Sequence, residues 1–394
     1  AGPVTYYCGF DPSAPSLHIG NLVQILTLRR LQLAGNHPLA LVGGATGLIG
    51  DPKMTGERTL NDPEIVAGWV ERIRGQIAPL LDFDGAYAAR MVNNLDWTAP
   101  LSAIDLLRGV GKHFRLSTML AKETVARRLA SDQGISFTEF SYQVLQGMDF
   151  RELYRRYGCE LQTGGNDQWG NLLAGVELIH KAEAATAHAF TTPLITKADG
   201  TKFGKTESGT VWLDPAMTTP YAFHQFWLNQ DDRDVVGYLK VFTFRPLAEI
   251  AELKEATEQR PHERAAQKAL AWDVTALVHG QAAAQGAVDA AEALFGQGDL
   301  AALDQPTLEA AIEGLPAASV ASGQDPLVVD LLAETNLEKS KGAARRTLAS
   351  GGVYVNNQKV SDQAAVVEAG QWLHGRYAIL RRGRKTLAVA KRTT

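Results

Sequence analysis

The spacing of apolar residues divides the first two hundred residues into alternating strands and helices. Val4–Tyr7 and Leu39–Val42 have the β-branched, aromatic and aliphatic content of short buried strands. Between them, residues 18–35 carry leucines and isoleucines at helical spacing and end at a glycine. Each strand is followed by a loop rich in glycine or proline, an arrangement that holds phosphate at helix N-termini in doubly wound sheets. The pattern therefore predicts an α/β domain with a parallel sheet.

Similar patterns continue to about residue 219. Phe137–Asp149 has helical spacing, and Cys159–Asn171 again has the composition of a strand, a glycine turn and a helix start. The other elements expected in this part are helices at 63–81 and 100–107 and strand segments at 91–95 and 192–196. Together these elements predict a Rossmann-like, doubly wound parallel-sheet domain at residues 1–219.

Two further domains are expected after residue 219. The alanine-rich stretches Glu263–Val278 and Gln281–Leu294 have high helix propensity, which predicts an all-α domain at 220–319. Serine, glycine and proline then predict a linker at 320–327. The last part, 328–394, is expected to be a small α+β domain with helices at 328–335 and 339–349, a hairpin turning on Asn356–Asn357, and a strand at 377–380.

The composition is that of an ordinary globular chain. Of its 394 residues, 45% are hydrophobic and 21% are charged, and no run approaches the length of a membrane span. No charged leader followed by an apolar segment opens the chain, and because a strand begins almost at Ala1 we expect residues to be missing before it. The two cysteines, Cys8 and Cys159, argue against a disulfide scaffold and suit a reducing cytoplasm.

The charge is unevenly distributed. Residues 326–394 hold 12 Lys and Arg against 5 Asp and Glu, a net charge of +7, so the other 325 residues carry −11. A basic end on an acidic body is typical of a polyanion-binding module, although a solvated basic tail would have the same composition.

Polar residues gather where the predicted strands end. His18 and Gly20 lie at a helix start, and Asp51 closes a glycine-rich turn where a carboxylate can pair with a substrate ammonium group. Asp167 and Gln168 fall near another helix start, where a carboxylate can accept a hydrogen bond from a ribose hydroxyl or simply cap the helix.

Two further groups have both a functional and a structural interpretation. Tyr142, Gln146 and Asp149 share one face of a helix, which is either the wall of a polar pocket or a solvated edge. Lys202 and Lys205 lie in a glycine-containing loop that can close over a triphosphate or remain a solvated turn.

Six sequence blocks in the family order, together with a C-terminal module, resemble those of the bacterial tyrosyl-tRNA synthetase family. His18-Ile19-Gly20-Asn21 is similar to the HIGH motif of class I synthetases, and Lys202-Phe203-Gly204-Lys205-Thr206 is similar to their KMSKS loop. The C-terminal stretch 339–360 resembles an S4-type RNA-binding domain. The remaining blocks are Tyr6–Pro12, Gly43–Pro52, Gly164–Gly170 and Ala198–Lys202.

The resemblance implies a two-step ligase reaction. L-tyrosine would react with ATP to give tyrosyl-adenylate and pyrophosphate, and the tyrosyl group would then pass to the 3′ end of tRNA(Tyr). It also implies that Mg²⁺ accompanies ATP without a dedicated protein metal site, and that a cytoplasmic homodimer with no membrane partner carries out the reaction. The 220–319 part would be the anticodon-binding domain. Such chemistry rests on positioning and charge stabilisation without a protein nucleophile.

The resemblance also assigns roles to individual residues. The residues expected to act on the reacting phosphates are His18, Asn21, Lys202, Lys205 and Thr206. Those expected to bind tyrosine are Tyr7 and Asp149 at the phenol, Asp51, Tyr142 and Gln146 at the ammonium group, Gln168 near the carboxylate, and Asn94 at the pocket edge. Those expected to bind ATP are Cys8, Gly9, Asp11, Ser13, His18, Gly20, Asn21, Gly165, Asp167, Lys202 and Lys205, and those expected to bind tRNA are Lys339, Lys341, Arg345 and Arg346.

One residue departs from the motif, and two alternatives remain open. Asn21 stands where the HIGH motif has its second histidine, although an amide can still donate a hydrogen bond to a ribose oxygen. Arg58 is expected near pyrophosphate, whereas Lys53 receives no role. The near alternative is a tryptophanyl-tRNA synthetase, and the distant one is a non-catalytic RNA-binding protein with the same fold.

Overall fold

The computed structural model describes residues 2–53, 56–201, 203–206, 209–296, 298–383 and 386–393, with only the backbone described at Lys205 and Thr206. Within these ranges, no helix is both long and apolar enough to cross a membrane.

The chain folds into two compact units. The first contains the residues up to Met217 together with Asp231–Ala266, and the second contains Thr218–Gln230 together with the residues from Gln267 onward. Part of the region expected to be one helical domain, 220–319, is therefore grouped with the N-terminal residues. The division into three domains expected from the sequence stays a prediction.

The first unit is built on a five-stranded parallel sheet with the order β3-β2-β1-β4-β5. This order confirms the predicted doubly wound fold, because the chain extends the sheet in one direction from β1 and in the other from β4. A ligand crevice is expected at the carboxyl ends of β1 and β4, where the direction changes. The strands are β1 (Thr5–Phe10), β2 (His37–Val42), β3 (Arg90–Asn93), β4 (Cys159–Gly165) and β5 (His188–Thr192).

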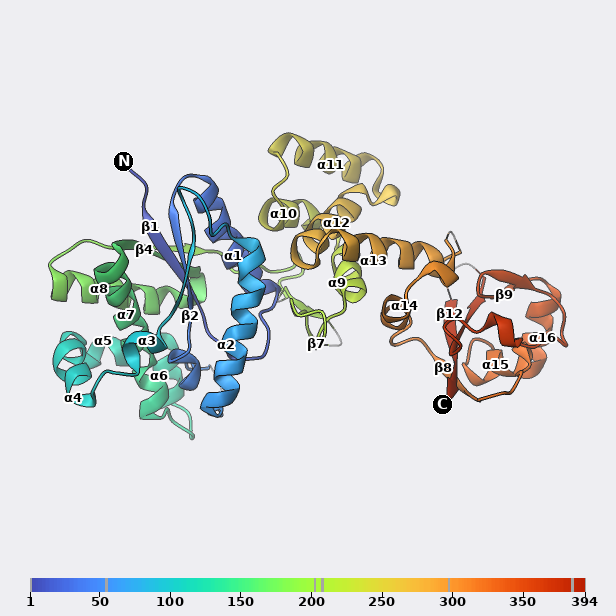
Figure 1. The fold of residues 1–394 in the computed structure, drawn as a ribbon, viewed down its shortest axis with the longest axis horizontal. Coiled ribbons are helices and arrows are strands. Elements are labelled where there is room, and N and C mark those ends of the chain that lie inside the picture. The colour runs from blue at the N-terminus through green and yellow to red at the C-terminus, as the bar shows by residue number, and fades with distance from the viewer. Residues whose placement is uncertain are drawn as a thin grey trace. The chain divides into compact units, whose positions relative to one another are not determined.

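Two pairs of helices cover the two faces of this sheet (Figure 1). On one side lie α1 (Ile19–Leu33) and α2 (Pro63–Ile77), and on the other lie α7 (Phe137–Tyr157) and α8 (Trp169–Glu183). Most of the apolar stripe of α1 that the sequence predicted is buried, including Leu22, Ile25 and Leu26, whereas Leu33 at the end of the helix is 62% exposed. Shorter elements of this unit are η1 (Thr46–Leu48), η2 (Ala78–Leu80), α3 (Leu95–Thr98), α4 (Ala103–Asp105), η3 (Leu106–Val110), η4 (Gly111–His113), α5 (Leu116–Leu120), α6 (Glu123–Leu129), η5 (Asn166–Gln168), β6 (Lys205–Thr206), β7 (Gly209–Thr210), α10 (Asp232–Phe242), α11 (Leu247–Gln259) and η6 (Pro261–Glu263).

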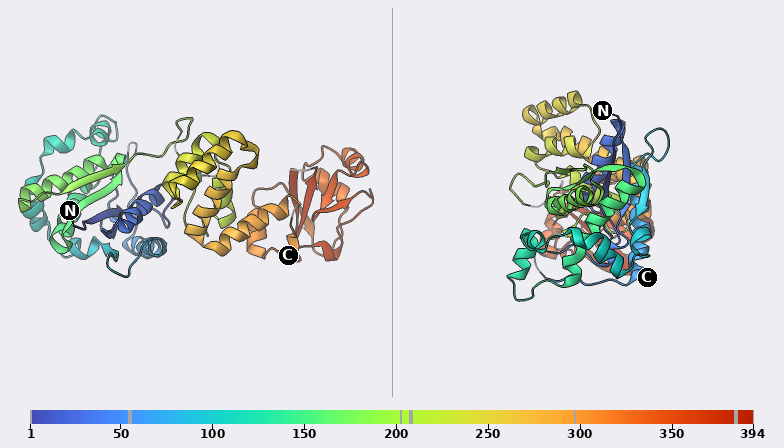
Figure 2. Two further views of the ribbon diagram at one scale, coloured as in Figure 1. Left: turned by 90° about the horizontal axis from the view of Figure 1, so that it is seen from above. Right: turned by 90° about the vertical axis from the view of Figure 1, so that its left-hand side faces the viewer.

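The second unit combines helices with a five-stranded mixed sheet of order β10-β9-β11-β12-β8. Alternate residues of β11 face opposite ways: Ala378 and Leu380 pack toward α15 and α16, whereas Tyr377 and Ile379 pack toward α13 and α14. Figure 1 and Figure 2 show these helices on the two sides of the sheet. The elements are α9 (Pro220–Leu228), α12 (Ala265–His279, whose first two residues fall in the first unit), α13 (Gln281–Leu294), η7 (Leu300–Ala302), α14 (Gln305–Ala311), β8 (Ala317–Ala321), α15 (Val328–Glu334), α16 (Lys341–Ala349), β9 (Val353–Val355), β10 (Gln358–Val360), η8 (Ala369–Gln371), β11 (Tyr377–Arg382) and β12 (Thr386–Thr393).

Two local expectations need correction, and one strand was missed. The strand expected at 192–196 is β5, which ends at Thr192 because Pro193 cannot donate to a strand ladder. Val320 and Ala321, expected to begin a linker, belong to β8, which pairs in parallel with β12. Strand β12 itself was not predicted. By contrast, the hairpin is confirmed: Asn356 and Asn357 both have positive φ, as a tight two-residue turn requires.

Candidate active site

His18 and Asn21 cap helix α1 at the end of the loop that follows β1. The Nδ1 atom of His18 accepts a hydrogen bond from the backbone N–H of Gly20 at 3.0 Å, and the side-chain oxygen of Asn21 accepts from the backbone N–H of His18 at 3.0 Å. A side chain at Gly20 would come within 2.8 Å of the His18 ring, so the glycine makes room for the imidazole. With Nδ1 accepting, the neutral imidazole carries its proton on Nε2.

The predicted lysine loop lies beside this helix start. The backbone N–H of Ile19 donates to the Val211 carbonyl at 3.2 Å, and Val211 in turn donates to the Gly204 carbonyl at 3.2 Å. Lys205 and Thr206 form β6, which pairs with β7. Lys202 and the side chains of Lys205 and Thr206 lie outside the described residues. The described backbone of residues 203–206 nevertheless lies beside the motif at 18–21.

Asp11 joins the loop after β1 to the glycine-rich turn after β2. Its two carboxylate oxygens accept hydrogen bonds from the Thr46 hydroxyl at 2.6 Å and the Tyr142 hydroxyl at 2.7 Å. Burial raises the pKa of Asp11, whereas these two hydroxyl donors lower it. A side chain at Gly43 would collide with the Asp11 carboxylate. The Tyr142 hydroxyl therefore donates its hydrogen bond to Asp11, and only its oxygen lone pairs remain to accept a hydrogen bond from a ligand.

Asp149 is a buried carboxylate held by two donors. Asn94 Nδ2 donates to one oxygen at 2.9 Å and Trp97 Nε1 donates to the other at 2.8 Å. Burial is the main cause that raises the pKa of Asp149 to about 7, while the two donors oppose that rise. Asn94 is 0% exposed and supports Asp149 from inside the core, and its expected place at the pocket edge stays a prediction.

Two buried polar groups of this cluster lack partners. The Tyr7 hydroxyl and the Gln146 side-chain oxygen make no hydrogen bond to any described residue. Tyr7 packs against Phe150 with ring centroids 5.3 Å apart, and its pKa is raised chiefly by burial and then by the charge of Asp149. An unpaired buried polar atom is costly, and a polar ligand that bonded these two atoms would remove that cost.

Asp51 lies in a second polar cluster with residues of η5 and α8. One of its oxygens accepts from Gln168 Nε2 at 3.1 Å and the other accepts from Asn171 Nδ2 at 3.2 Å. Lys122 donates to the Asn171 side-chain oxygen at 2.6 Å. Burial lowers the pKa of Lys122, and the nearby charges of Asp51 and Asp167 oppose that shift. The cluster thus places a carboxylate, two amides and an ammonium group side by side.

The remaining predicted residues differ in their exposure to solvent. Cys8 is buried, and burial raises the pKa of its thiol to about 12. Asp167 and Ser13 are exposed, and a side chain at Gly165 would come within 2.5 Å of Asp167. The four candidate RNA-binding residues are exposed on or next to α16: Lys339, Lys341, Arg345 and Arg346.

Sequence reasoning missed four members of the site: Thr46, Trp97, Lys122 and Asn171. Asn171 lies three residues after Gln168 near the start of a helix, a spacing that would have suggested a shared face. The other three come from segments whose polar residues have no periodic pattern. In the described part of the chain, no group of three or more His, Cys, Asp or Glu side chains could hold a metal ion.

Comparisons with known proteins show the family to which the chain belongs. Residues 1–296 match the family model described as tRNA synthetases class I (W and Y), and residues 307–390 match the tyrosine–tRNA ligase SYY-like C-terminal domain. The chain is 65% identical to the tyrosine–tRNA ligase of Streptomyces avermitilis over 393 residues, which cover 100% of this chain and 93% of that relative. It is 63% identical to the enzyme of Streptomyces coelicolor, again over 393 residues covering 100% and 93%.

A solved structure shares the fold. A C-terminally truncated mitochondrial tyrosyl-tRNA synthetase from Coccidioides posadasii matches with a TM-score of 0.63 and 34% identity, over 72% of this chain and 82% of that one. The doubly wound strand order, the HIGH-like cap and the near full-length identity lead to one assignment. This chain belongs to the class I tRNA synthetases of the tryptophan and tyrosine group and, within it, to the tyrosine–tRNA ligase family.

Proposed function

We propose that this chain activates L-tyrosine with ATP and transfers the tyrosyl group to the 3′ end of tRNA(Tyr). In the first step a carboxylate oxygen of tyrosine attacks the α-phosphorus of ATP, and the bond to pyrophosphate breaks. In the second step a ribose hydroxyl of the tRNA attacks the tyrosyl carbonyl, and AMP leaves. The observation that carries the proposal is the unpaired Tyr7 hydroxyl, which shares a buried cluster with the Asp149 carboxylate.

The two polar clusters suit the two ends of tyrosine. The substrate phenol would donate to Asp149 and accept from Tyr7, which would satisfy the unpaired hydroxyl. Its ammonium group would be bound by Asp51, by the Gln146 oxygen, and by the lone pairs of Tyr142, whose own proton goes to Asp11. Gln168, already bonded to Asp51, would lie near the substrate carboxylate.

The loop after β1 and the start of α1 suit the nucleotide. Helix N-termini bind anions through free backbone N–H groups, and His18 Nε2 and the Asn21 amide add donors at the start of α1. We propose that Lys202, Lys205 and Thr206 stabilise charge on the phosphates, and that Asp167 accepts from the ribose. Cys8, Gly9, Ser13 and Gly165 would line the nucleotide loops. Mg²⁺ is the usual companion of a triphosphate, and we propose that it arrives with ATP.

Amino-acid-dependent exchange between ATP and pyrophosphate tests this function directly. Tyrosine should support exchange, whereas tryptophan and phenylalanine should support little. Exchange with tryptophan but not with tyrosine would favour a tryptophanyl-tRNA synthetase, the other specificity that the same family model covers. No exchange with any amino acid would favour a non-catalytic RNA-binding role.

Tyrosine binding should weaken in acid. The pKa of Asp149 is about 7, so lowering the pH from 8 to 6 changes this carboxyl from about 90% to about 10% ionised. A protonated carboxyl loses an acceptor for the phenol, and the Kd for tyrosine should therefore rise roughly tenfold. Isothermal titration at several pH values measures this. Phenylalanine, which has no phenol, is the matched ligand, and an equal pH response for both amino acids would contradict the role of Asp149.

The basic surface of α16 should contribute to tRNA binding. Arg345 and Arg346 are exposed, whereas Lys341 pairs with Asp330 at 2.9 Å. Replacing both arginines by alanine should weaken tRNA binding and reduce its salt dependence by a slope of about one per lost phosphate contact, with tyrosine-dependent exchange unchanged. The double arginine-to-lysine variant keeps both charges and is the control. An unchanged affinity for tRNA in the alanine variant would show that Arg345 and Arg346 do not contribute to tRNA binding.

We also propose that the chain works as a cytoplasmic homodimer. The support is the family alone. Sedimentation of the purified chain distinguishes a dimer from a monomer, and a monomer with full exchange activity would exclude the need for a partner subunit in the first step.

A further inference from the structure

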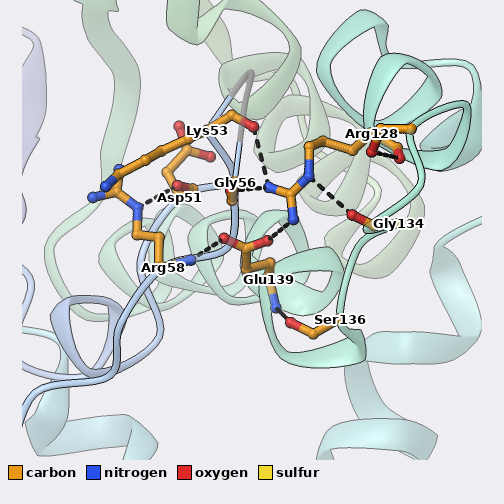
Figure 3. Close-up of polar contacts among 9 residues, drawn as sticks. Asp51, Lys53, Gly56, Arg58, Arg128, Gly134, Ser136 and Glu139 are labelled. Carbon is orange, nitrogen blue, oxygen red and sulfur yellow. Dashed lines mark hydrogen bonds and ion pairs between the residues drawn. The ribbon is translucent and has the colours of Figure 1, made fainter.

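A buried ion pair connects helices α6 and α7 outside the proposed tyrosine pocket. Arg128 Nη2 lies 2.9 Å from Glu139 Oε2, and the two side chains are 1% and 2% exposed (Figure 3). Taking both charges out of water costs several kcal/mol per ion and is tolerated when the remaining polar atoms are also bonded. The other hydrogen bonds of Arg128 and Glu139 therefore show which segments of the chain the ion pair fixes in position.

Those bonds go mainly to the backbone of the loop that follows Asp51. Arg128 Nη1 donates to the carbonyls of Gly56 at 2.6 Å and Lys53 at 3.3 Å (Figure 3). Glu139 Oε1 accepts from the backbone N–H of Arg58 at 2.9 Å. The pair thus holds the described residues on both sides of positions 54 and 55. A further bond, from Arg128 Nε to the Gly134 carbonyl at 2.9 Å, ties it to the segment before α7.

The side chain of Arg58 leads back to the proposed active site. Its Nε atom donates to the backbone carbonyl of Asp51 at 2.6 Å (Figure 3), and its aliphatic part lies against Gly50, where any side chain would collide with it. The charge of Arg58 also lowers the pKa of Asp11, which places the guanidinium within electrostatic reach of the loop after β1. Arg58 Nε is bound to Asp51 and, among the described residues, no hydrogen bond is made by its two Nη nitrogens, so these nitrogens can bind an anionic ligand.

Helix α7 couples this loop to the tyrosine pocket. Glu139, Tyr142, Gln146 and Asp149 are spaced by three, four and three residues, so they lie along one face of the helix. The same rigid element therefore sets the position of the loop and of the proposed tyrosine-binding side chains.

We propose that Arg128 and Glu139 form a latch that positions Arg58 toward the phosphates of the bound nucleotide. Both are positioning residues, since their described contacts are with each other, the loop backbone and the segment before α7. The inference rests on the proposed function, because ATP and pyrophosphate are the anions that the loop would meet.

Glu139→Gln is the primary test, measured as the KM for pyrophosphate in the reverse reaction and as the rate of tyrosyl-adenylate formation. Glutamine keeps the shape and one acceptor oxygen but sets its NH₂ group against the Arg128 guanidinium. The KM for pyrophosphate should rise about tenfold and adenylate formation should fall on the order of 10²-fold, as expected for a misplaced catalytic group, while the Kd for tyrosine stays unchanged. Arg128→Lys, which keeps the charge but loses the forked donors, should give the same pattern.

Glu123→Gln is the matched control. Glu123 pairs with Arg127 at 2.8 Å on the same helix as Arg128, but that pair is exposed. Its loss should therefore change neither the KM for pyrophosphate nor the rate of tyrosyl-adenylate formation. Arg58→Ala supplies the second test: adding Glu139→Gln to it should cause no further loss, because the latch acts through Arg58.

Additive losses in the double variant, or unchanged pyrophosphate KM in both latch variants, would overturn the latch while wild-type exchange still supports the function. A parallel loss of tyrosine binding would show that the pair maintains the whole site and does not specifically position Arg58. Absence of tyrosine-dependent exchange in the wild-type chain would overturn the function and the latch together.

Discussion

Asp149→Asn is expected to lower kcat/KM for tyrosine on the order of 10²–10³-fold. Asn94 and Trp97 each donate to one oxygen of Asp149, so an asparagine NH₂ group would be set against one of these buried donors. The substrate phenol would also lose a charged acceptor. One buried donor left unpaired costs about 1–3 kcal/mol, and losing the charged hydrogen bond adds a similar amount. Steady-state exchange kinetics with tyrosine and phenylalanine measure the effect.

Selectivity should fall together with activity. Phenylalanine makes no hydrogen bond at this position, so its poor turnover should change little and the tyrosine-to-phenylalanine ratio should narrow. Tyr7→Phe is the matched variant, because it removes a hydroxyl that has no partner among the described residues and so should preserve stability. It should weaken tyrosine binding about tenfold, the value of one hydrogen bond. An unchanged ratio in both variants would refute the phenol-binding assignment.

Lys205→Ala should abolish most tyrosine activation, with a loss on the order of 10²–10³-fold in the rate of adenylate formation. An ammonium group that stabilises charge on the departing pyrophosphate acts mainly in the transition state, where such electrostatic contributions are largest. The backbone of β6 and β7 lies beside the start of α1, where His18 is held. Single-turnover measurement of tyrosyl-adenylate gives the rate, and filter binding gives tRNA affinity, which should stay near normal.

An exposed lysine elsewhere provides the control for that variant. Lys254 on α11 is 60% exposed and lies 3.7 Å from Glu258, so Lys254→Ala should leave adenylate formation unchanged. An equal rate of tyrosyl-adenylate formation in Lys205→Ala and the wild-type chain would show that Lys205 does not stabilise the transition state. Equal losses of activation and tRNA binding would instead indicate a general effect on the fold.

The local features of the site could be predicted from the sequence because they depend on neighbours in the chain. His18, Gly20 and Asn21 form a helix cap whose hydrogen bonds span three residues, and the structure places them at the start of α1 as expected. The shared face of Tyr142, Gln146 and Asp149 follows from helical periodicity alone. The doubly wound, parallel character of the sheet, though not its strand order, followed from the alternation of strands and helices together with the family resemblance.

Features that depend on distant pairing could not be predicted. Asn94 is a turn-forming residue by type, but the tertiary fold buries it between Thr46 and Asp149. Strand β8 consists of small residues and is a strand because β12, some seventy residues later, pairs with it. Lys122 enters the site through Asn171, and nothing in the local pattern around Lys122 indicates that contact. Burial and partner choice at these positions are properties of the assembled fold.

A crystal structure with a non-hydrolysable analogue of tyrosyl-adenylate tests most directly whether Tyr7 and Asp149 bind the substrate phenol. We expect the phenol oxygen to lie within hydrogen-bond distance of both the Tyr7 hydroxyl and the Asp149 carboxylate, with the ammonium group near Asp51 and the phosphate near His18. An analogue bound with its phenol away from Tyr7 and Asp149 would show that these two residues do not bind the substrate phenol.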